Sequence, residues 1–216
     1  MKTLIEKILG LISKFLAAKE KRKEKKSRTK IPYVAICVGH SRDGDNGARS
    51  VSGVHEWAYN KVVADLLRTQ LKQRGINSIV LSDYNAATYS EAMKWVADRI
   101  KKEKCDIAVE LHFNSYHSTV AEGYEYLYYS GSEKGKRLAE CFLRSHSNVS
   151  NVQKNRGVKE IEKGGRGSLF LKSVKPPAVI CEPFFGSSPK EWVLLGSKHA
   201  VIADIYAEAI ANYFAA

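Results

Sequence analysis

Four residues whose side chains can bind a metal ion or move a proton are spread along the chain. His112 and Glu182 directly follow apolar runs that are typical of buried strands, and His40 follows such a run after one glycine, Gly39. Glu56 opens the first long helical pattern. Because strand carboxyl ends and neighbouring helix starts face one crevice in an open α/β sheet, we expect these side chains to converge. Two imidazoles and one carboxylate suit a catalytic zinc ion with an open fourth position, and a second carboxylate suits its general base.

The elements that would position these residues alternate along the chain. Apolar or alternating runs predict strands at residues 33–38, 76–81, 106–111, 123–129 and 178–181, and leave 156–163 open as a further short strand. Helical spacing of apolar residues predicts helices at 56–74, 89–104, 132–147 and 198–214. Strands that alternate with helices are typical of an α/β fold, here with three layers: a mostly parallel, twisted sheet with helices on both faces.

Some aromatic and imidazole side chains are expected near the surface. Tyr124, Tyr126 and Tyr128 alternate along their run, which favours an edge or half-exposed strand with one aromatic face. His146 and His199 fall on helix faces and are expected to be solvated.

Composition indicates a soluble globular protein with one main domain. The 216 residues are 44% hydrophobic and 27% charged, which is enough to bury a sizeable core. The net charge is +12, and residues 1–30 alone contribute +8, from nine Lys and two Arg against three Glu. None of the four cysteines forms a CxxC pair, which argues against a cysteine-bound zinc ion.

The first 30 residues differ in character from the rest. Residues 4–16 carry apolar side chains at helical spacing, and residues 19–30 are densely charged, so we expect 1–30 to be a basic amphipathic helix and linker, and 31–216 to be the catalytic domain. No run reaches the ~20 apolar residues that span a bilayer. Lys14 interrupts the apolar run, which argues against a signal peptide.

Three interpretations of residues 1–30 stay open: packing on the body, contact with an anionic membrane or outer envelope, and self-association or export. We favour the membrane or envelope contact, with Lys2, Lys7 and Lys14 facing it, because a basic amphipathic helix suits an anionic surface. Nucleic acid is not an expected partner, since the basic run lacks interleaved aromatics and no base-reading motif is present.

Motifs around the four residues occur in an order that resembles a known family, the zinc-dependent N-acetylmuramoyl-L-alanine amidases with a type 3 amidase domain. The resemblance covers roughly residues 31–214. The matching motifs are Gly39-His40, Glu56 with Asn60 four residues later, Leu111-His112-Phe113-Asn114, and the run Pro177 to Glu182 followed by Phe185.

The resemblance implies one Zn²⁺ per chain, held by His40, Glu56 and His112, with Glu182 as the general base. It implies peptidoglycan as the substrate, cleaved at the amide between N-acetylmuramic acid and the L-alanine of the stem peptide. Such a substrate needs an open groove, which we expect residues 41–53, 114–118 and 156–167 to line.

Further side chains are expected to contact the substrate or to orient the ligands: Asn114, Glu110 and Asn60. Glu110 is a departure, because the family more often has a Ser two residues before the second His. On a strand, Glu110 and His112 share a face, so Glu110 either orients His112 or meets a basic side chain elsewhere. The turn Cys37-Val38-Gly39-His40-Ser41 also departs from the family pattern but keeps the ligand.

Two other functions stay open on the sequence alone: another zinc hydrolase of similar frame, such as a carboxypeptidase, or an inactive wall-binding protein. For the biological setting we favour a phage or prophage endolysin that causes cytolysis. Without an evident cleavable signal peptide, it would be made in the cytoplasm and act on the cell wall after release. A cellular enzyme that remodels the wall is the alternative.

Overall fold

The computed structural model describes residues 14, 30–84, 86 and 88–216. The chain divides into two units, Met1–Ile31 and Pro32–Ala216. The helix expected at residues 4–16 lies outside the described residues except for Lys14, so the special role of residues 1–30 stays a prediction. Among the described helices, none is both long enough and apolar enough to cross a membrane.

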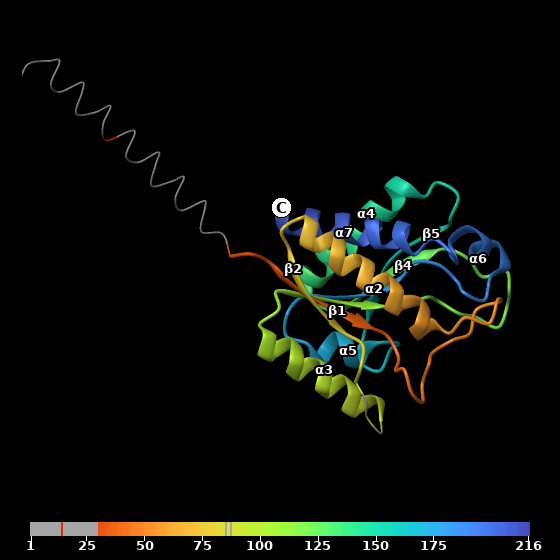
Figure 1. Ribbon diagram of the computed structural model, residues 1–216, viewed down its shortest axis with the longest axis horizontal. Coiled ribbons are helices and arrows are strands. Elements are labelled where there is room, and N and C mark those ends of the chain that lie inside the picture. The colour runs from red at the N-terminus through yellow and green to blue at the C-terminus, as the bar shows by residue number, and fades with distance from the viewer. Residues whose placement is uncertain (1–13, 15–29, 85, 87) are drawn as a thin grey trace, which may run out of the picture. The chain divides into compact units, whose positions relative to one another are not determined.

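A six-stranded sheet forms the centre of the unit Pro32–Ala216 (Figure 1). In chain order its strands are β1 (Tyr33–Val38), β2 (Asn77–Leu81), β3 (Ile107–Leu111), β4 (Tyr124–Tyr129), β5 (Asn155–Ile161) and β6 (Ala178–Glu182). They lie side by side in the order β2-β1-β3-β6-β4-β5. The first four of these are mutually parallel, and β4 and β5 run the other way, with β4 antiparallel to β6. The predicted mostly parallel sheet is therefore confirmed.

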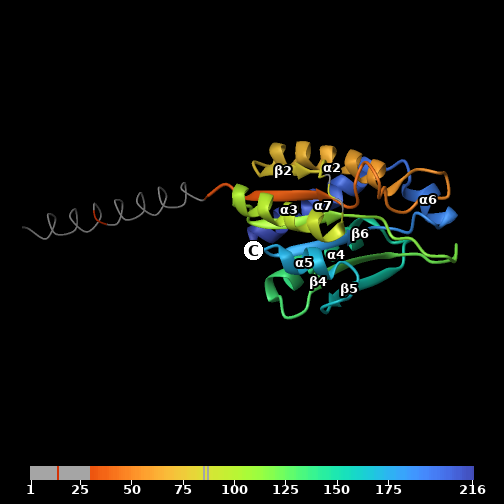
Figure 2. The ribbon, with the colours of Figure 1, turned by 90° about the horizontal axis from the view of Figure 1, so that it is seen from below.

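Helices cover both faces of the sheet and complete the predicted three layers (Figures 1 and 2). One face packs against α2 (Glu56–Gln73), α4 (Glu133–Val149) and α7 (His199–Ala215), and the other against α3 (Tyr89–Glu103) and α5 (Ser168–Ser173). A short helix, α6 (Pro189–Leu195), follows β6. Strands such as β3 are buried along their whole length because helices exclude water from both faces.

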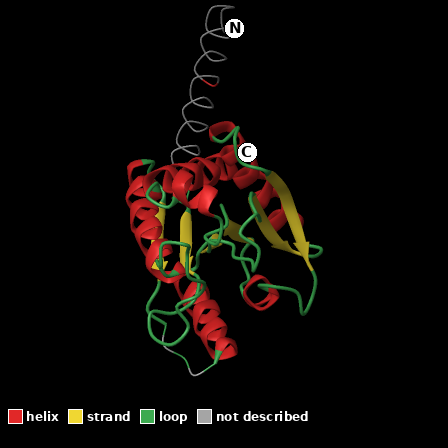
Figure 3. Ribbon diagram, turned by 90° about the vertical axis from the view of Figure 1, so that its right-hand side faces the viewer, coloured by secondary structure: helices red, strands yellow, loops and turns green. Residues whose placement is uncertain are grey.

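Side chains alternate between the two faces of the sheet along β3, and this alternation decides which of them reach the site. Val109 and Leu111 pack into the core beneath α2 and α7, so Ala108 and Glu110 point to the face covered by α3 and α5. Among the described residues, α3 and α5 cover this second face, and the carboxyl ends of β1, β3 and β6 open beside them. Figure 3 looks onto this edge and shows the connecting loops gathered there.

The structure corrects two expectations about exposure. The tyrosine-rich strand β4 is not at an edge, because β5 flanks it and α4 covers its aromatic face, which leaves Tyr126 0% exposed. His146 on α4 is buried rather than solvated: its ring stacks on Tyr124 with the centroids 3.8 Å apart. His199 is half-buried against the ring of Tyr59.

Candidate metal centre and active site

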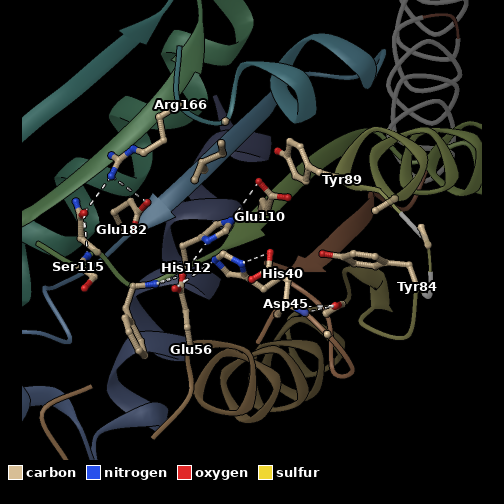
Figure 4. Close-up of a pocket in the computed structure, with 18 of the residues that line it drawn as sticks. His40, Asp45, Glu56, Tyr84, Tyr89, Glu110, His112, Ser115, Arg166 and Glu182 are labelled. Carbon is tan, nitrogen blue, oxygen red and sulfur yellow. Dashed lines mark hydrogen bonds and ion pairs between the residues drawn. The ribbon is translucent and has the colours of Figure 1, made fainter. Parts of the chain in front are cut away.

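The four residues that the sequence singles out lie in one cavity of about 550 Å³. His40 follows β1, His112 follows β3, Glu182 ends β6, and Glu56 is the first residue of α2. Figure 4 shows the two imidazoles beside Glu56, with Glu182 and Arg166 on one side of them and two tyrosines on the other. The predicted convergence at the carboxyl edge of the sheet is therefore observed.

Both imidazoles turn one nitrogen toward the carboxylate of Glu56. Nδ1 of His112 lies 2.8 Å from Oε1 of Glu56, and Nε2 of His40 lies 3.3 Å from Oε2. One ligand atom from each of the three residues lies within 4.8 Å of the other two. Two nitrogens and one carboxylate oxygen at this spacing form a donor set that fits a zinc ion and leaves one position free.

The outer nitrogen of each imidazole contacts a second carboxylate. Nδ1 of His40 is 3.1 Å from Oδ2 of Asp45, and Nε2 of His112 is 3.3 Å from Oε2 of Glu110. Histidines that bind metals in proteins are commonly oriented in this way, because the outer partner fixes the tautomer and the direction of the ring. Of the two partners expected for Glu110, the structure therefore shows the histidine.

Local backbone geometry explains why the imidazoles pack so closely. A Cβ atom on Gly39 would lie 2.2 Å from Cε1 of His112, so only glycine leaves room for the ring at this position. The next residue, His40, has a φ of 65°, a conformation that residues other than glycine adopt rarely. Such backbone outliers concentrate at functional sites, where the surrounding contacts stabilise them.

Glu56 is held at both oxygens. The backbone N–H of Phe113 donates to Oε1 over 3.0 Å, and the backbone N–H of Ala48 donates to Oε2 over 3.0 Å. Its place in the first turn of α2 also favours negative charge, because the partial positive end of the helix dipole lies there. The carboxylate is thus fixed in position and poised to face a cation.

The charges of these three residues depend on one another. Burial raises the pKa of Glu56, but hydrogen bonds with His112 and His40 outweigh it and lower the pKa to about 2. Burial lowers the pKa of His112, but hydrogen bonds with Glu110 and Glu56 outweigh it and raise the pKa well above its usual value. The carboxylates around the imidazoles thus create a negative site that attracts positive charge.

Glu182 has a different environment. Its side chain is buried, and Oε2 has no hydrogen-bond partner among the described residues. Oε1 lies 3.7 Å from Nη1 of Arg166. Burial raises the pKa of Glu182 to about 7, despite the opposing effects of His112 and Arg166. A buried carboxyl group with a pKa near neutrality can accept and release a proton, which is the property required of a general base.

Asn114 connects the loop after β3 to the far side of the cavity. Its Nδ2 donates to Oε1 of Glu125 over 2.9 Å, and its Oδ1 accepts from Nη1 of Arg166 over 3.0 Å. Asn114 lines the cavity with Ser115, as do residues of the two other segments that we expected around the groove, such as Asp45 and Arg166.

Asn60 is buried beside the cavity wall and does not line the cavity. It is 1% exposed and is not among the described residues that line the cavity. It lies one turn after Glu56 on α2, so of its two expected roles, contact with the substrate is not supported. The other role, orienting a metal ligand, stays a prediction.

Three further residues of the site, Asp45, Glu125 and Arg166, were not predicted from the sequence. Asp45 sits in a glycine-rich loop with another aspartate, and the sequence carries no sign that it faces His40. Glu125 and Glu182 are register partners on adjacent strands, which only the sheet order reveals. Arg166 lies in a loop with no periodic pattern.

Comparison with solved structures shows where this fold occurs. The N-acetylmuramoyl-L-alanine amidase AmiC2 of Nostoc punctiforme is 20% identical, with a TM-score of 0.74 and coverage of 86% of this chain and 98% of that one. The catalytic domain of the amidase CwlV from Bacillus (Paenibacillus) polymyxa var. colistinus is 22% identical, with a TM-score of 0.73 and coverage of 86% and 99%. Both share the fold of this chain.

A third structure is more similar in sequence. The catalytic domain of CD27L, an endolysin targeting Clostridia difficile, is 28% identical, with a TM-score of 0.71 and coverage of 84% of this chain and 97% of that one. Comparison with curated protein sequences gives no match. The sequence profile described as N-acetylmuramoyl-L-alanine amidase matches residues 34–212. The chain therefore belongs to the N-acetylmuramoyl-L-alanine amidase family, whose members hydrolyse peptidoglycan.

Proposed function

We propose that this amidase is zinc-dependent, with one zinc ion held by His40, Glu56 and His112. Glu182 is the general base that takes a proton from the water attacking the amide between N-acetylmuramic acid and L-alanine. One arrangement carries the proposal: donor atoms of the three ligands lie within 4.8 Å of one another. In the same cavity lies the buried carboxylate of Glu182, one of whose oxygens has no hydrogen-bond partner in the described part of the chain.

The residues present fit a zinc ion. Two imidazoles and a carboxylate are a ligand set found in catalytic zinc sites, and the carboxylates of Asp45 and Glu110 would orient the imidazoles. A zinc ion bound there supplies a Lewis acid, which lowers the pKa of water and polarises the scissile carbonyl group.

Glu182 would carry the proton through the reaction. Its Oε2 has no partner among the described residues, so it is free to accept a proton from the attacking water. The same carboxyl group then returns that proton to the departing amine, which would otherwise be a poor leaving group. A pKa of about 7 suits both steps, because the group gains and loses a proton readily near neutral pH.

Asn114 is proposed to keep the cavity wall in place and to contact the substrate. Its backbone N–H donates to the carbonyl of Phe184 over 2.8 Å, and its carbonyl accepts from the N–H of Gly186 over 2.8 Å. These bonds tie the loop that follows His112 to the segment that follows Glu182. The distance between the ligand side and the base side of the cavity would thereby be fixed.

Digestion of purified peptidoglycan tests this proposal. Zinc-loaded protein is incubated with the substrate, with and without EDTA, and the released fragments are identified by mass spectrometry. We expect EDTA to abolish release of stem peptides that begin with a free L-alanine amine, and added zinc to restore it. Unchanged release in EDTA would contradict the zinc dependence. Release of single terminal amino acids would instead indicate a carboxypeptidase, and no release by zinc-loaded protein a wall-binding role.

The biological setting is also a proposal: a phage or prophage endolysin, made in the cytoplasm and acting on the wall after release. Its support is the resemblance to the catalytic domain of CD27L, an endolysin that is 28% identical. If it is correct, cytoplasmic expression leaves bacteria intact until the membrane is permeabilised, and lysis then follows. Wall cleavage in intact cells would favour an exported remodelling enzyme.

Contact with an anionic membrane or outer envelope is proposed for residues 1–30, with Lys2, Lys7 and Lys14 at the contact. Its support is the +8 charge of this segment beside an apolar stripe, and Lys14 is exposed. Co-sedimentation with anionic vesicles is expected for the full chain and not for a variant that lacks residues 1–30. Equal binding by the two would contradict the contact.

A further inference from the structure

The sheet places two carboxylates directly opposite each other at the edge of the cavity. Glu125 on β4 and Glu182 on β6 are register partners in the antiparallel pair, so their side chains lie on the same face. Like charges in such a position repel each other, and both groups are buried. The fold must therefore supply positive charge beside them.

Glu125 receives nearly all of that charge. Nη2 of Arg166 lies 2.7 Å from its Oε1, and Nε of Arg156 lies 2.7 Å from its Oε2. Asn114 donates a further hydrogen bond to Oε1. Burial raises the pKa of Glu125, but hydrogen bonds from Arg156 and Arg166 outweigh it and lower the pKa. Glu125 thus stays ionised and fully paired, which makes it unsuited to proton transfer.

Arg166 extends from this pair toward Glu182. Its Nη1 lies 3.7 Å from Oε1 of Glu182, and the same nitrogen donates to Oδ1 of Asn114 over 3.0 Å. The neighbouring residue, Gly167, allows the loop to lie close against β6, because a Cβ atom at this position would be 2.2 Å from Cδ1 of Ile180. Ile180 and Glu182 share one face of β6, so the loop backbone is fixed next to Glu182.

From this geometry we infer that Arg166 is the positioning residue of the general base: anchored by Glu125 and Asn114, it holds its positive charge 3.7 Å from one oxygen of Glu182 and leaves the other free for the proton. The inference rests on the proposed role of Glu182. A general base alternates between charged and neutral forms, so a cation paired with it alone would lose its partner at each protonation. Glu125 removes this problem, because Arg166 keeps a permanent counter-charge throughout the cycle.

A substrate-binding role for Arg166 is less favoured by the charges. The side chain is 53% exposed and lines the cavity, so it is accessible. However, the two arginines Arg156 and Arg166 already face the two carboxylates Glu125 and Glu182, so the cluster has no excess positive charge to attract an anionic substrate group. Binding and positioning also differ in what they predict for kcat and KM.

Steady-state kinetics of Arg166→Met on a soluble N-acetylmuramoyl peptide tests the inference in zinc-loaded protein. We expect kcat to fall about 10- to 100-fold, which is less than the about 10²- to 10⁴-fold attributed to general base catalysis because the base itself remains, with KM changed less than about threefold. Zinc content should stay at one per chain. Arg166→Lys should recover part of the lost kcat, because it restores the charge but not the planar fork of donors.

Arg156→Met is the matched control, since Arg156 binds the other oxygen of Glu125 and no contact joins it to Glu182 among the described residues. Its loss of kcat should be smaller than that of Arg166→Met. The inference would be overturned if Arg156→Met and Arg166→Met lost kcat equally. It would also be overturned if Arg166→Met raised KM at constant kcat, or if Arg166→Met had wild-type kinetics.

Glu182→Gln, measured in parallel, separates this inference from the proposed function. An inactive Glu182→Gln beside a fully active Arg166→Met would overturn the role of Arg166 alone. A fully active Glu182→Gln would remove the proposed base, and the role of Arg166 with it.

Discussion

The two sides of the cavity differ in how completely their polar atoms are paired. The metal side comprises His40, Glu56 and His112. Both ring nitrogens of each histidine and both carboxylate oxygens of Glu56 have partners within 3.3 Å. On the base side, Glu182 has one distant arginine and one oxygen without a described partner.

This difference matches the tasks of the two sides. Metal ligands must keep their positions, and complete pairing fixes their orientation before the ion binds. A proton carrier must change its own charge, which complete pairing with cations would oppose. Buried polar groups are normally paired, so an oxygen of Glu182 that faces the cavity without a partner among the described residues suits a group that exchanges a proton with the substrate.

The largest expected effect comes from breaking the metal side. His112→Ala and His40→Ala each remove one of three ligands, so we expect loss of bound zinc and of all measurable amidase activity. Elemental analysis of the purified variants, with circular dichroism to confirm the fold, measures this. One zinc per chain in both folded variants would exclude these histidines as ligands.

Breaking the base side should have a large effect on turnover and none on the metal. Glu182→Gln keeps the shape of the side chain but cannot accept the proton, so kcat should fall by about 10²- to 10⁴-fold. Zinc content serves as the internal control and should match the wild type. Wild-type turnover in this variant would show that another group carries the proton.

A smaller effect is expected from the carboxylates behind the imidazoles. Glu110→Gln and Asp45→Asn keep the size of the side chain but remove the negative charge on the outer nitrogen, so zinc affinity should fall by about 10- to 100-fold. Competition with a chromogenic chelator measures the affinity. Asp43→Asn, in the same loop as Asp45, is a matched control. Unchanged affinity in Glu110→Gln would mean that its contact with His112 does not support the metal.

The smallest expected effect comes from a chain of hydrogen bonds that lies behind the base side of the cavity. Tyr126 donates to Nδ1 of His146, and Nε2 of His146 donates to Gln153, which in turn donates to the carbonyl of Pro183 beside Glu182. This chain needs a neutral imidazole. Burial lowers the pKa of His146 to about 4, from 6.5.

Because the unfolded chain binds this proton more readily, the stabilisation is complete above pH 6.5 and is lost as the pH falls toward 4, by about 3 kcal/mol in total. Urea unfolding at pH 7.5, 6 and 5 measures it in the wild type and in His146→Gln. The wild type should lose more stability than the variant over this range. Parallel loss in both would show that His146 does not cause the pH dependence.

The metal side could be predicted from the sequence because its residues follow strong local signals. His40 and His112 come just after a buried strand and Glu182 ends one, and parallel strands bring their carboxyl ends together whatever the loops do. Glu56 begins a long amphipathic helix, which is a signal of similar strength. Asp45, Glu125 and Arg166 depend instead on sheet order and loop conformation, which no local pattern encodes.

The wrong or missing predictions about the fold also arise where tertiary structure, and not a local pattern, decides the outcome. The alternating tyrosines of β4 match a strand with one exposed face, but α4 covers that face, so tertiary packing overrides the pattern. The helices α5 and α6 are too short for a helical period to stand out. The start of α6 did carry a signal, since Ser188 caps the helix, Pro189 is its first residue, and Glu191 follows at the third position.

A crystal structure of the zinc-loaded protein, with anomalous data collected at the zinc edge, would locate the ion relative to Glu182. We expect one anomalous peak per chain, in contact with Nε2 of His40, Nδ1 of His112 and the carboxylate of Glu56, with Glu182 near the peak but not bound to it. A peak coordinated by Glu182, or a peak elsewhere in the chain, would contradict the division into a metal side and a base side.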